Sequence, residues 1–332
     1  MLVQKYKDML SGKSVIRQLS EFATARGQEI GYENVFDYSL GNPSVPVPRE
    51  FTDRMIHMLA TKEPLELHGY SPSLGITSVR EAIAENLENF QINFEAFEEM
   101  LTEKVKAVLI NTPNNPSGVV YSTPTLQRLA DILSEKSKEY GHIIYLISDE
   151  PYREIVFEGV DSPCVSYFYD NTIMCYSFSK SLSLPGERIG YVAVNPACED
   201  AETMINMCGQ ISRGIGHNCP PSIIQLAVAQ VLDKTADLSV YETNMNILYK
   251  ELTELGFTCV KPGGTFYIFP KALEEDAKVF SQKALKYDLV LVPGDSFGAP
   301  GYFRMAYCVD TEKVERSLEA LRKFVKTEYA TI

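Results

Sequence analysis

The chain has 332 residues, of which 45% are hydrophobic and 23% charged, and this composition predicts one or two compact globular domains rather than a disordered polypeptide. The net charge of −13 repels nucleic-acid phosphates and acidic membrane surfaces. No stretch reaches the ~20 apolar residues of a membrane span, so we expect neither nucleic acid nor membrane as a partner.

The N-terminal segment and the cysteines favour a cytoplasmic protein. Residues 1–14, MLVQKYKDMLSGKS, carry charges where a signal peptide has its apolar core. The seven cysteines lie in apolar segments without C-x-x-C spacing, which predicts buried thiols rather than disulfides or a metal site. The four histidines show no H-x-H or H-x-x-x-H pair, and we expect no metal.

The N-terminal third predicts helical segments and one extended segment. Residues 15–28 have the spacing of an amphipathic helix, and residues 35–48 form an extended, proline-punctuated segment that we expect to pack against the C-terminal region. Residues 77–87, TSVREAIAENL, predict a further helix.

The central third alternates short apolar runs with helical segments, a pattern that indicates a mostly parallel sheet buried on both faces and wrapped by helices. Polar residues follow three of the runs, at 111–115, 149–152 and 177–180, and we expect them to converge at the carboxyl edge of the sheet. The expected strands are 105–113, 142–152, 171–180 and 187–195, with a helix at 126–141.

After Pro220 the pattern becomes mixed. We expect one long helical stretch at 222–256, strands around 263–270, 288–298 and 302–309, and a final helix at 314–325. Such a mixture is typical of a second, smaller α+β domain.

The stretch SFSKSLSLPGERIGY, residues 177–191, places a lysine directly after an apolar strand. Partial burial would lower the pKa of Lys180 and allow it to form a Schiff base. Ser177, Ser179 and Arg188 could bind a phosphate, so the group fits pyridoxal 5′-phosphate, an aldehyde cofactor that carries one. Asp149 would then pair with the protonated ring nitrogen, and Tyr152 and Asn115 would donate to the ring oxygen.

Three motifs, NTPNNPSG (111–118), SDEPY (148–152) and SFSKSLSLPGERIGY (177–191), resemble in order and spacing those of class I/II aminotransferases. These are fold type I pyridoxal-phosphate enzymes of the aspartate aminotransferase type. SLGNPSVPVP (39–48), GYSP (69–72) and FRMAYC (303–308) resemble further segments of the family.

The resemblance implies a role for each matching residue. Lys180 would be the Schiff-base lysine and the base that moves the Cα proton. Arg304 would bind the substrate carboxylate with Gly41 and Asn115 beside it. The cofactor-binding set would be Asn115, Asp149, Tyr152, Ser177, Ser179, Lys180, Arg188 and, from the partner subunit's copy of the chain, Tyr70.

The resemblance also implies a homodimeric, pyridoxal-phosphate-dependent aminotransferase that moves an amino group from an amino acid to a 2-oxo acid. The expected domains are an N-terminal arm with part of the small domain at 1–48, a large cofactor-binding domain at 49–245 and a small C-terminal domain at 246–332.

Other interpretations stay open at this point. The same electron sink would serve a lyase or decarboxylase, and Ser177-x-x-Lys180 matches the S-x-x-K of serine acyl-enzymes. A non-catalytic relative is a third class. Each residue also has a structural interpretation: a turn for Asn115, a cap for Asp149, a solvated side chain for Lys180, and ion pairs for Arg188 and Arg304.

One departure from the family concerns the junction of Leu87 and Glu88. We identify no glycine-rich phosphate turn at a helix N-terminus and no aromatic residue that would stack on the cofactor ring. About two βα units, or roughly 60 residues at ~30 each, are missing there. Either they are deleted from the protein, or the chain has a gap between Leu87 and Glu88; we favour the gap.

Overall fold

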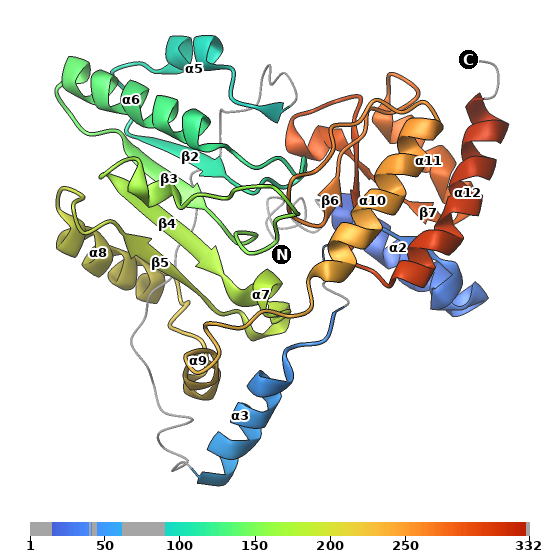
Figure 1. Cartoon of the computed structure of the whole chain (residues 1–332), viewed down its shortest axis with the longest axis horizontal. Coiled ribbons are helices and arrows are strands. Elements are labelled where there is room, and N and C mark those ends of the chain that lie inside the picture. The colour runs from blue at the N-terminus through green and yellow to red at the C-terminus, as the bar shows by residue number, and fades with distance from the viewer. Residues whose placement is uncertain (1–14, 40, 42–44, 62–89, 330–332) are drawn as a thin grey trace, which may run out of the picture.

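The computed structural model describes residues 15–39, 41, 45–61 and 90–329 (Figure 1). Three of the predictions lie outside these residues: the helix at 77–87, the position of Tyr70, and the junction of Leu87 and Glu88. Within the described ranges, no helix combines the length and apolar composition that a membrane span requires.

A four-stranded sheet in the order β2-β3-β4-β5 occupies one half of the molecule (Figure 1). Strands β2, β3 and β4 are parallel, as predicted, and their register places Asn111 opposite Asp149 and Asp149 opposite Cys175. The polar ends of the first two strands therefore meet. The strands are β2 (Ala107–Asn111), β3 (Tyr145–Asp149), β4 (Thr172–Ser177) and β5 (Gly190–Val194).

Strand β5 differs from the prediction in direction and burial. It pairs antiparallel with β4, whereas β2, β3 and β4 run parallel to one another. Gly190 and Tyr191 are exposed, so burial on both faces is wrong for this strand. Along β2 and β3 buried residues alternate with partly buried ones.

Helix α6 (Thr123–Tyr140) covers the more deeply buried face of the sheet. Its side chains Leu126, Leu129 and Leu133 are at most 1% exposed and pack with Val108 of β2. Ser122 caps its N-terminus and Gly141 ends it in the left-handed conformation. Figure 1 shows α5 (Phe94–Met100) beside α6, with α8 (Ala201–Gly214) across the sheet against β5.

The predicted helix at 222–256 is wrong as a single element. The structure has α9 (Ser222–Val228) and α10 (Ser239–Glu254), with a non-helical link between them. Two hydrogen bonds lie in this link. The amide N–H of Ala236 donates to the distant Ser181 carbonyl at 2.8 Å, and the Asp237 carboxylate accepts from the amide N–H of Ser239 at 3.1 Å, where α10 begins. An aspartate that binds a nearby backbone N–H in this way competes with a continuous helix.

The other half of the molecule is built from the C-terminal region and the N-terminal segment. A three-stranded antiparallel sheet has the order β6-β9-β8, and β1 of the N-terminal segment pairs parallel with β7. The elements are β1 (Phe36–Asp37), β6 (Tyr267–Ile268), β7 (Leu289–Val290), β8 (Val292–Pro293), β9 (Phe303–Ala306), α2 (Val15–Ile30), α11 (Ala277–Ala284) and α12 (Thr311–Tyr329).

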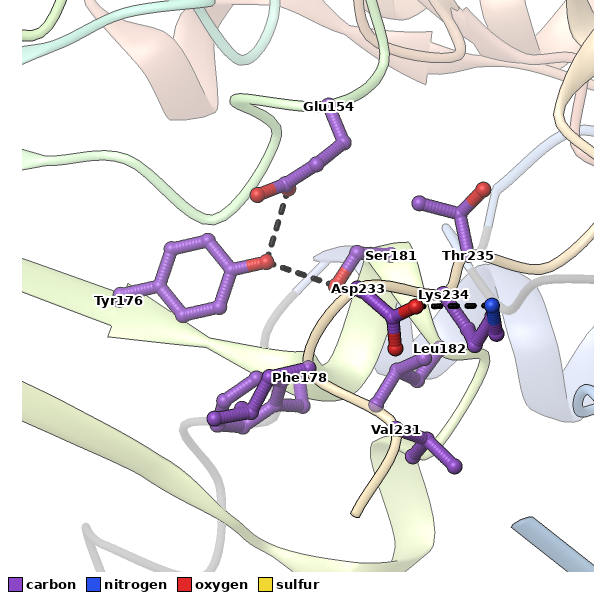
Figure 2. Close-up of a pocket in the computed structure, with 10 residues that line it drawn as sticks. Glu154, Tyr176, Phe178, Ser181, Leu182, Val231, Asp233, Lys234 and Thr235 are labelled. Atoms are coloured by element: carbon purple, nitrogen blue, oxygen red, sulfur yellow. Dashed lines mark hydrogen bonds and ion pairs between the residues drawn. The ribbon is translucent and has the colours of Figure 1, made fainter. Parts of the chain in front are cut away.

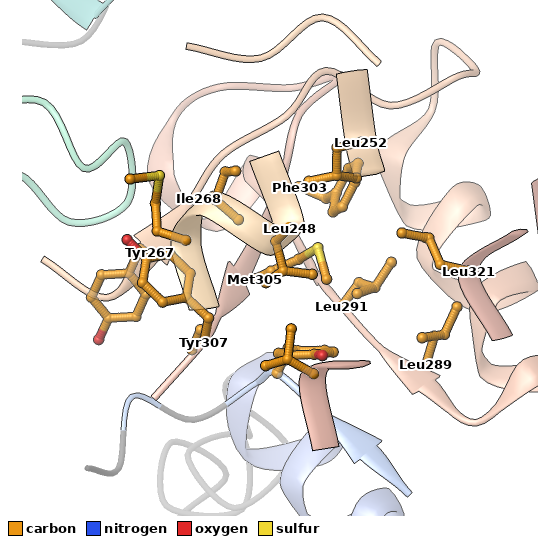
Figure 3. Close-up of a cluster of buried hydrophobic side chains, with 14 of the residues drawn as sticks. Leu248, Leu252, Tyr267, Ile268, Leu289, Leu291, Phe303, Met305, Tyr307 and Leu321 are labelled. Carbon is orange, nitrogen blue, oxygen red and sulfur yellow. The ribbon is translucent and has the colours of Figure 1, made fainter. Parts of the chain in front are cut away.

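A large hydrophobic cluster holds this half together (Figure 3). Three of its leucines are fully buried: Leu248 of α10, Leu321 of α12, and Leu291 between β7 and β8. Tyr241 of α10 and Tyr152, from the segment after β3, pack in the same cluster. The domain boundaries at 48 and 245 stay predictions.

Helices α3 (Arg49–Thr61), α8 and α11 were not predicted, and a short helix at Phe178–Ser181 replaces the end of the strand predicted at 171–180. Helix α3 packs against α9 (Figure 1). The elements as a whole form a mostly parallel sheet with helices beside a smaller α+β unit, which confirms the predicted α/β class.

Candidate active site

Lys180 lies on α7 (Phe178–Ser181), a short helix that follows β4 without a loop. Ser177 ends the strand and caps the helix, since its hydroxyl accepts a hydrogen bond from the Ser179 amide at 3.1 Å. The Lys180 amino group donates to the Gly41 carbonyl at 2.7 Å and lies 5.3 Å from the centre of the Phe266 ring. Strand and cap together fix where the amine is presented.

Burial lowers the pKa of the Lys180 amine below its ordinary value of 10.5, and the positive charges of Arg304 and Arg188 act in the same direction. Desolvation disfavours the charged form of a lysine. A larger fraction of the amine is therefore neutral near pH 7 than in an exposed lysine, and a neutral amine is a nucleophile and a base.

The lowered pKa has a measurable effect on stability. Between the folded-state pKa and 10.5 the unfolded chain binds more protons at Lys180 than the folded chain, so this group adds stability as pH rises through that window. We expect Lys180→Met to be more stable than the wild type near pH 7, with the advantage shrinking toward pH 10.5. Urea unfolding at several pH values measures this, and Lys261→Met controls for loss of a charge; an advantage that grows with pH would contradict it.

Asp149 is held at the end of β3 by its neighbour in β2. The Asn111 amide donates to the Asp149 carboxylate at 3.1 Å and to the Asp149 carbonyl at 2.9 Å. The Asn111 amide oxygen accepts from the backbone N–H of Asn115 at 2.7 Å. One asparagine thus fixes both a carboxylate and the loop that carries Asn115.

Arg304 is only 3% exposed, and burial lowers its pKa. Its Nη1 donates to the Asn115 amide oxygen at 3.0 Å and its Nη2 donates to the Ser39 carbonyl at 2.8 Å. Among the described residues, the buried Nε has no hydrogen-bond partner. No carboxylate of this chain pairs with Arg304 among the ion pairs of the described residues, which argues against a structural salt bridge.

Two aromatic rings lie against the Arg304 guanidinium. Its carbon lies 4.5 Å from the centre of the Tyr267 ring and 4.8 Å from that of Phe297, in the 3₁₀ helix η6 (Gly294–Phe297). The Tyr267 hydroxyl lies 3.2 Å from the Tyr152 hydroxyl, and the Tyr152 side chain is 5% exposed. Tyr152 and Arg304 are therefore linked through Tyr267.

Gly41 belongs to the same group of residues. Its carbonyl accepts from Lys180, and a Cβ at this position would overlap the Tyr267 hydroxyl. A side chain at residue 41 could not be accommodated without moving Tyr267. The glycine lets the N-terminal segment approach the lysine.

The residues expected to bind phosphate are less well assembled. The Ser177 hydroxyl donates to that of Ser179 at 2.6 Å, and Ser179 is buried. Arg188 is exposed, and its Nη1 donates to the Pro185 carbonyl at 2.9 Å. Its charge acts on Lys180, but the structure records no hydrogen bond between Arg188 and either serine.

The serine acyl-enzyme interpretation loses support in this geometry. Ser177 does open a short helix, which the sequence did not indicate. However, the Lys180 amine donates to the Gly41 carbonyl, and the Ser177 hydroxyl donates to Ser179. The described contacts do not join this serine to the lysine that would have to activate it.

A cavity of about 150 Å³ lies beside α7 (Figure 2). The Tyr176 hydroxyl contacts Glu154 at 2.8 Å and Ser181 at 2.7 Å on its wall. None of the residues predicted to bind cofactor or substrate lines it. This cavity is therefore separate from the group around Lys180.

Sequence patterns missed Tyr267, Phe297 and the role of Asn111. The end of β2 was singled out as polar, so Asn111 could have been found from its place opposite Asp149. Tyr267 and Phe297 sit in apolar runs and carried no distinguishing signal.

Residues 74–321 match the model of a family described as aminotransferase class I and II. Aromatic-amino-acid aminotransferase 2 of Thermococcus litoralis is 32% identical over 252 residues, covering 71% of this chain and 61% of the relative. Aspartate aminotransferase of Bacillus subtilis is 32% identical over 265 residues, covering 74% of this chain and 63% of the relative. The chain thus spans less than two thirds of the length of these relatives.

Solved structures show the same likeness. An amino transferase from Eubacterium rectale has a TM-score of 0.91 and 35% identity, and the match covers 99% of this chain and 100% of that one. Aspartate aminotransferase from Thermus thermophilus with maleate has a TM-score of 0.81 and 20% identity over 98% of this chain and 99% of that one, which shows a shared fold.

Proposed function

The chain belongs to the aminotransferase class I and II family, and from this premise we propose that it moves an amino group from an amino acid to a 2-oxo acid with pyridoxal 5′-phosphate as cofactor. One observation carries the proposal. The Lys180 amine is desolvated, and the positive charge of Arg304 acts on it. Arg304 in turn donates to Asn115 and is linked to Tyr152 through Tyr267.

The residues present fit the ring end of the cofactor. Lys180 would hold the aldehyde carbon, and the Asp149 carboxylate, oriented by Asn111, would pair with the ring nitrogen. The Asn115 amide oxygen accepts from Arg304, which leaves its Nδ2 group to act, with Tyr152, as the donor that would bind the ring oxygen. Ser177, Ser179 and Arg188 would bind the phosphate. When bound, the cofactor supplies an electron sink for negative charge at the substrate Cα.

The protein side chains would perform the remaining tasks. The buried Nε of Arg304 has no partner among the described residues, and a guanidinium of this kind can bind a carboxylate with paired N–H groups. Gly41 would lie beside the substrate. Lys180 would take the Cα proton and return it, which its lowered pKa favours because the amine must be neutral to accept it.

A screen of amino acids with a 2-oxo acid acceptor tests this function. We expect 2-oxo acid formation from the donor without release of ammonia. A lyase or decarboxylase on the same fold would instead release ammonia or carbon dioxide from a single substrate. The relatives named for aromatic amino acids and aspartate suggest these donors for the first panel.

We propose a homodimer and a cytoplasmic location as well. The family site is completed across a subunit interface, and Tyr70 would supply the partner's contribution to the phosphate. Seven cysteines, each buried or partly buried, suit a reducing compartment. Sedimentation of the active protein tests the assembly, and a fully active monomer would contradict it.

A further inference from the structure

Tyr267 is the first residue of β6 and lies at the edge of the large hydrophobic cluster (Figure 3). Its side chain is 3% exposed. Its ring lies against the Arg304 guanidinium at 4.5 Å and its hydroxyl lies 3.2 Å from the Tyr152 hydroxyl. The ring of Tyr267 therefore contacts Arg304, and its hydroxyl contacts Tyr152.

The backbone around Tyr267 fixes this orientation. Thr265 has a φ of 64°, a left-handed conformation that strains a β-branched residue. The Thr265 hydroxyl accepts from the Tyr267 amide N–H at 3.0 Å. On the opposite side, the absence of a side chain at Gly41 makes room for the Tyr267 hydroxyl. Local structure on both sides is thus arranged around this tyrosine.

We propose that Tyr267 is a positioning residue of the amino-transfer site, whose hydroxyl orients the Tyr152 phenol while its ring orients the Arg304 guanidinium. The inference rests on the proposed function. It assigns the two parts of the side chain to two steps: the hydroxyl acts on the cofactor-facing phenol, and the ring acts on recognition of the substrate carboxylate.

The surroundings of both partners support this assignment. The Arg304 guanidinium carbon also lies 4.8 Å from the centre of the Phe297 ring, so two aromatic rings restrict the position of the guanidinium. The Tyr152 and Tyr267 hydroxyls lie 3.2 Å apart, and either can be the donor. When Tyr267 donates to the Tyr152 oxygen, the Tyr152 proton is left for a ligand.

Two substitutions separate the two parts. Tyr267→Phe removes the hydroxyl and keeps the ring, so kcat should fall about three- to tenfold, the effect of one hydrogen bond, with KM for the amino donor unchanged. Tyr267→Leu also removes the ring, so KM should rise about five- to thirtyfold in addition. Tyr38→Phe, which removes a buried hydroxyl bonded to Ser317 at 2.6 Å in the same core, should change neither constant.

A double-mutant cycle tests the hydroxyl pair without any reaction. Tyr152→Phe, Tyr267→Phe and the double variant are compared by urea unfolding of the cofactor-free protein, and we expect a coupling of about three- to tenfold in the unfolding equilibrium constant. Absent coupling, or equal kcat in the wild type and Tyr267→Phe, would overturn the inference. An inactive wild type that shows the coupling would refute the proposed function and still support the positioning of Tyr152 by Tyr267.

Discussion

Replacing Lys180 with alanine should lower the rate of amino transfer by at least about 10²–10⁴-fold, the contribution of one positioned acid–base group. The loss should be in kcat, because the variant keeps Arg304 and the loop that carries Asn115. The wild-type amine donates to Gly41, and alanine leaves that carbonyl next to the space vacated by the amine. Steady-state kinetics with a saturating donor measure the loss.

Lys261→Ala is the matched control for Lys180→Ala. Lys261 is exposed and lies 6.0 Å over the Tyr249 ring, outside the proposed site. It should keep wild-type kinetics and thermal stability. Wild-type amino transfer by Lys180→Ala would remove Lys180 from the reaction and leave the family membership unchanged.

Arg304→Lys should raise KM for the amino acid by about 10- to 100-fold, because a hydrogen bond to a charged group contributes about 1.5–3 kcal/mol. A lysine keeps the charge but presents one ammonium in place of the planar fork that binds a carboxylate. Affinity for pyridoxal phosphate should stay within about twofold of wild type, since the residues proposed to hold it are unchanged. Initial rates over a range of donor concentrations and a cofactor titration measure both.

Arg322→Lys is the control for Arg304→Lys. Arg322 also forms a paired contact with a carboxylate, at 2.7 Å and 2.6 Å from the Glu251 oxygens, but it lies on α12 at the surface. It should leave KM unchanged. If Arg304→Lys lost cofactor and substrate affinity equally, Arg304 would have a structural role instead.

The local sequence pattern was sufficient to predict the site residues that lie at the ends of strands. Asn115, Asp149 and Lys180 follow apolar runs, and parallel pairing of β2, β3 and β4 brings such ends to one edge. The break at residues 229–238 could have been inferred from Asp237, whose side chain competes with the helix for backbone N–H groups.

Long-range contacts could not be read from the sequence. The Lys180–Gly41 bond joins residues 139 positions apart, and the Arg304–Ser39 bond joins residues 265 positions apart. Tyr267 lies in the apolar run FYIF, where its ring is indistinguishable from core until the fold places it against Arg304. Burial and partners, rather than residue type, give these side chains their roles.

The most direct measurement is where pyridoxal phosphate attaches to the protein. The wild-type protein is incubated with the cofactor, its visible absorption is recorded, and the complex is reduced with borohydride before peptide mapping by mass spectrometry. We predict a visible band that reduction abolishes and a cofactor adduct on Lys180, absent from Lys180→Ala. No band, or an adduct on an exposed lysine such as Lys261 with Lys180 unmodified, would contradict the assignment of Lys180.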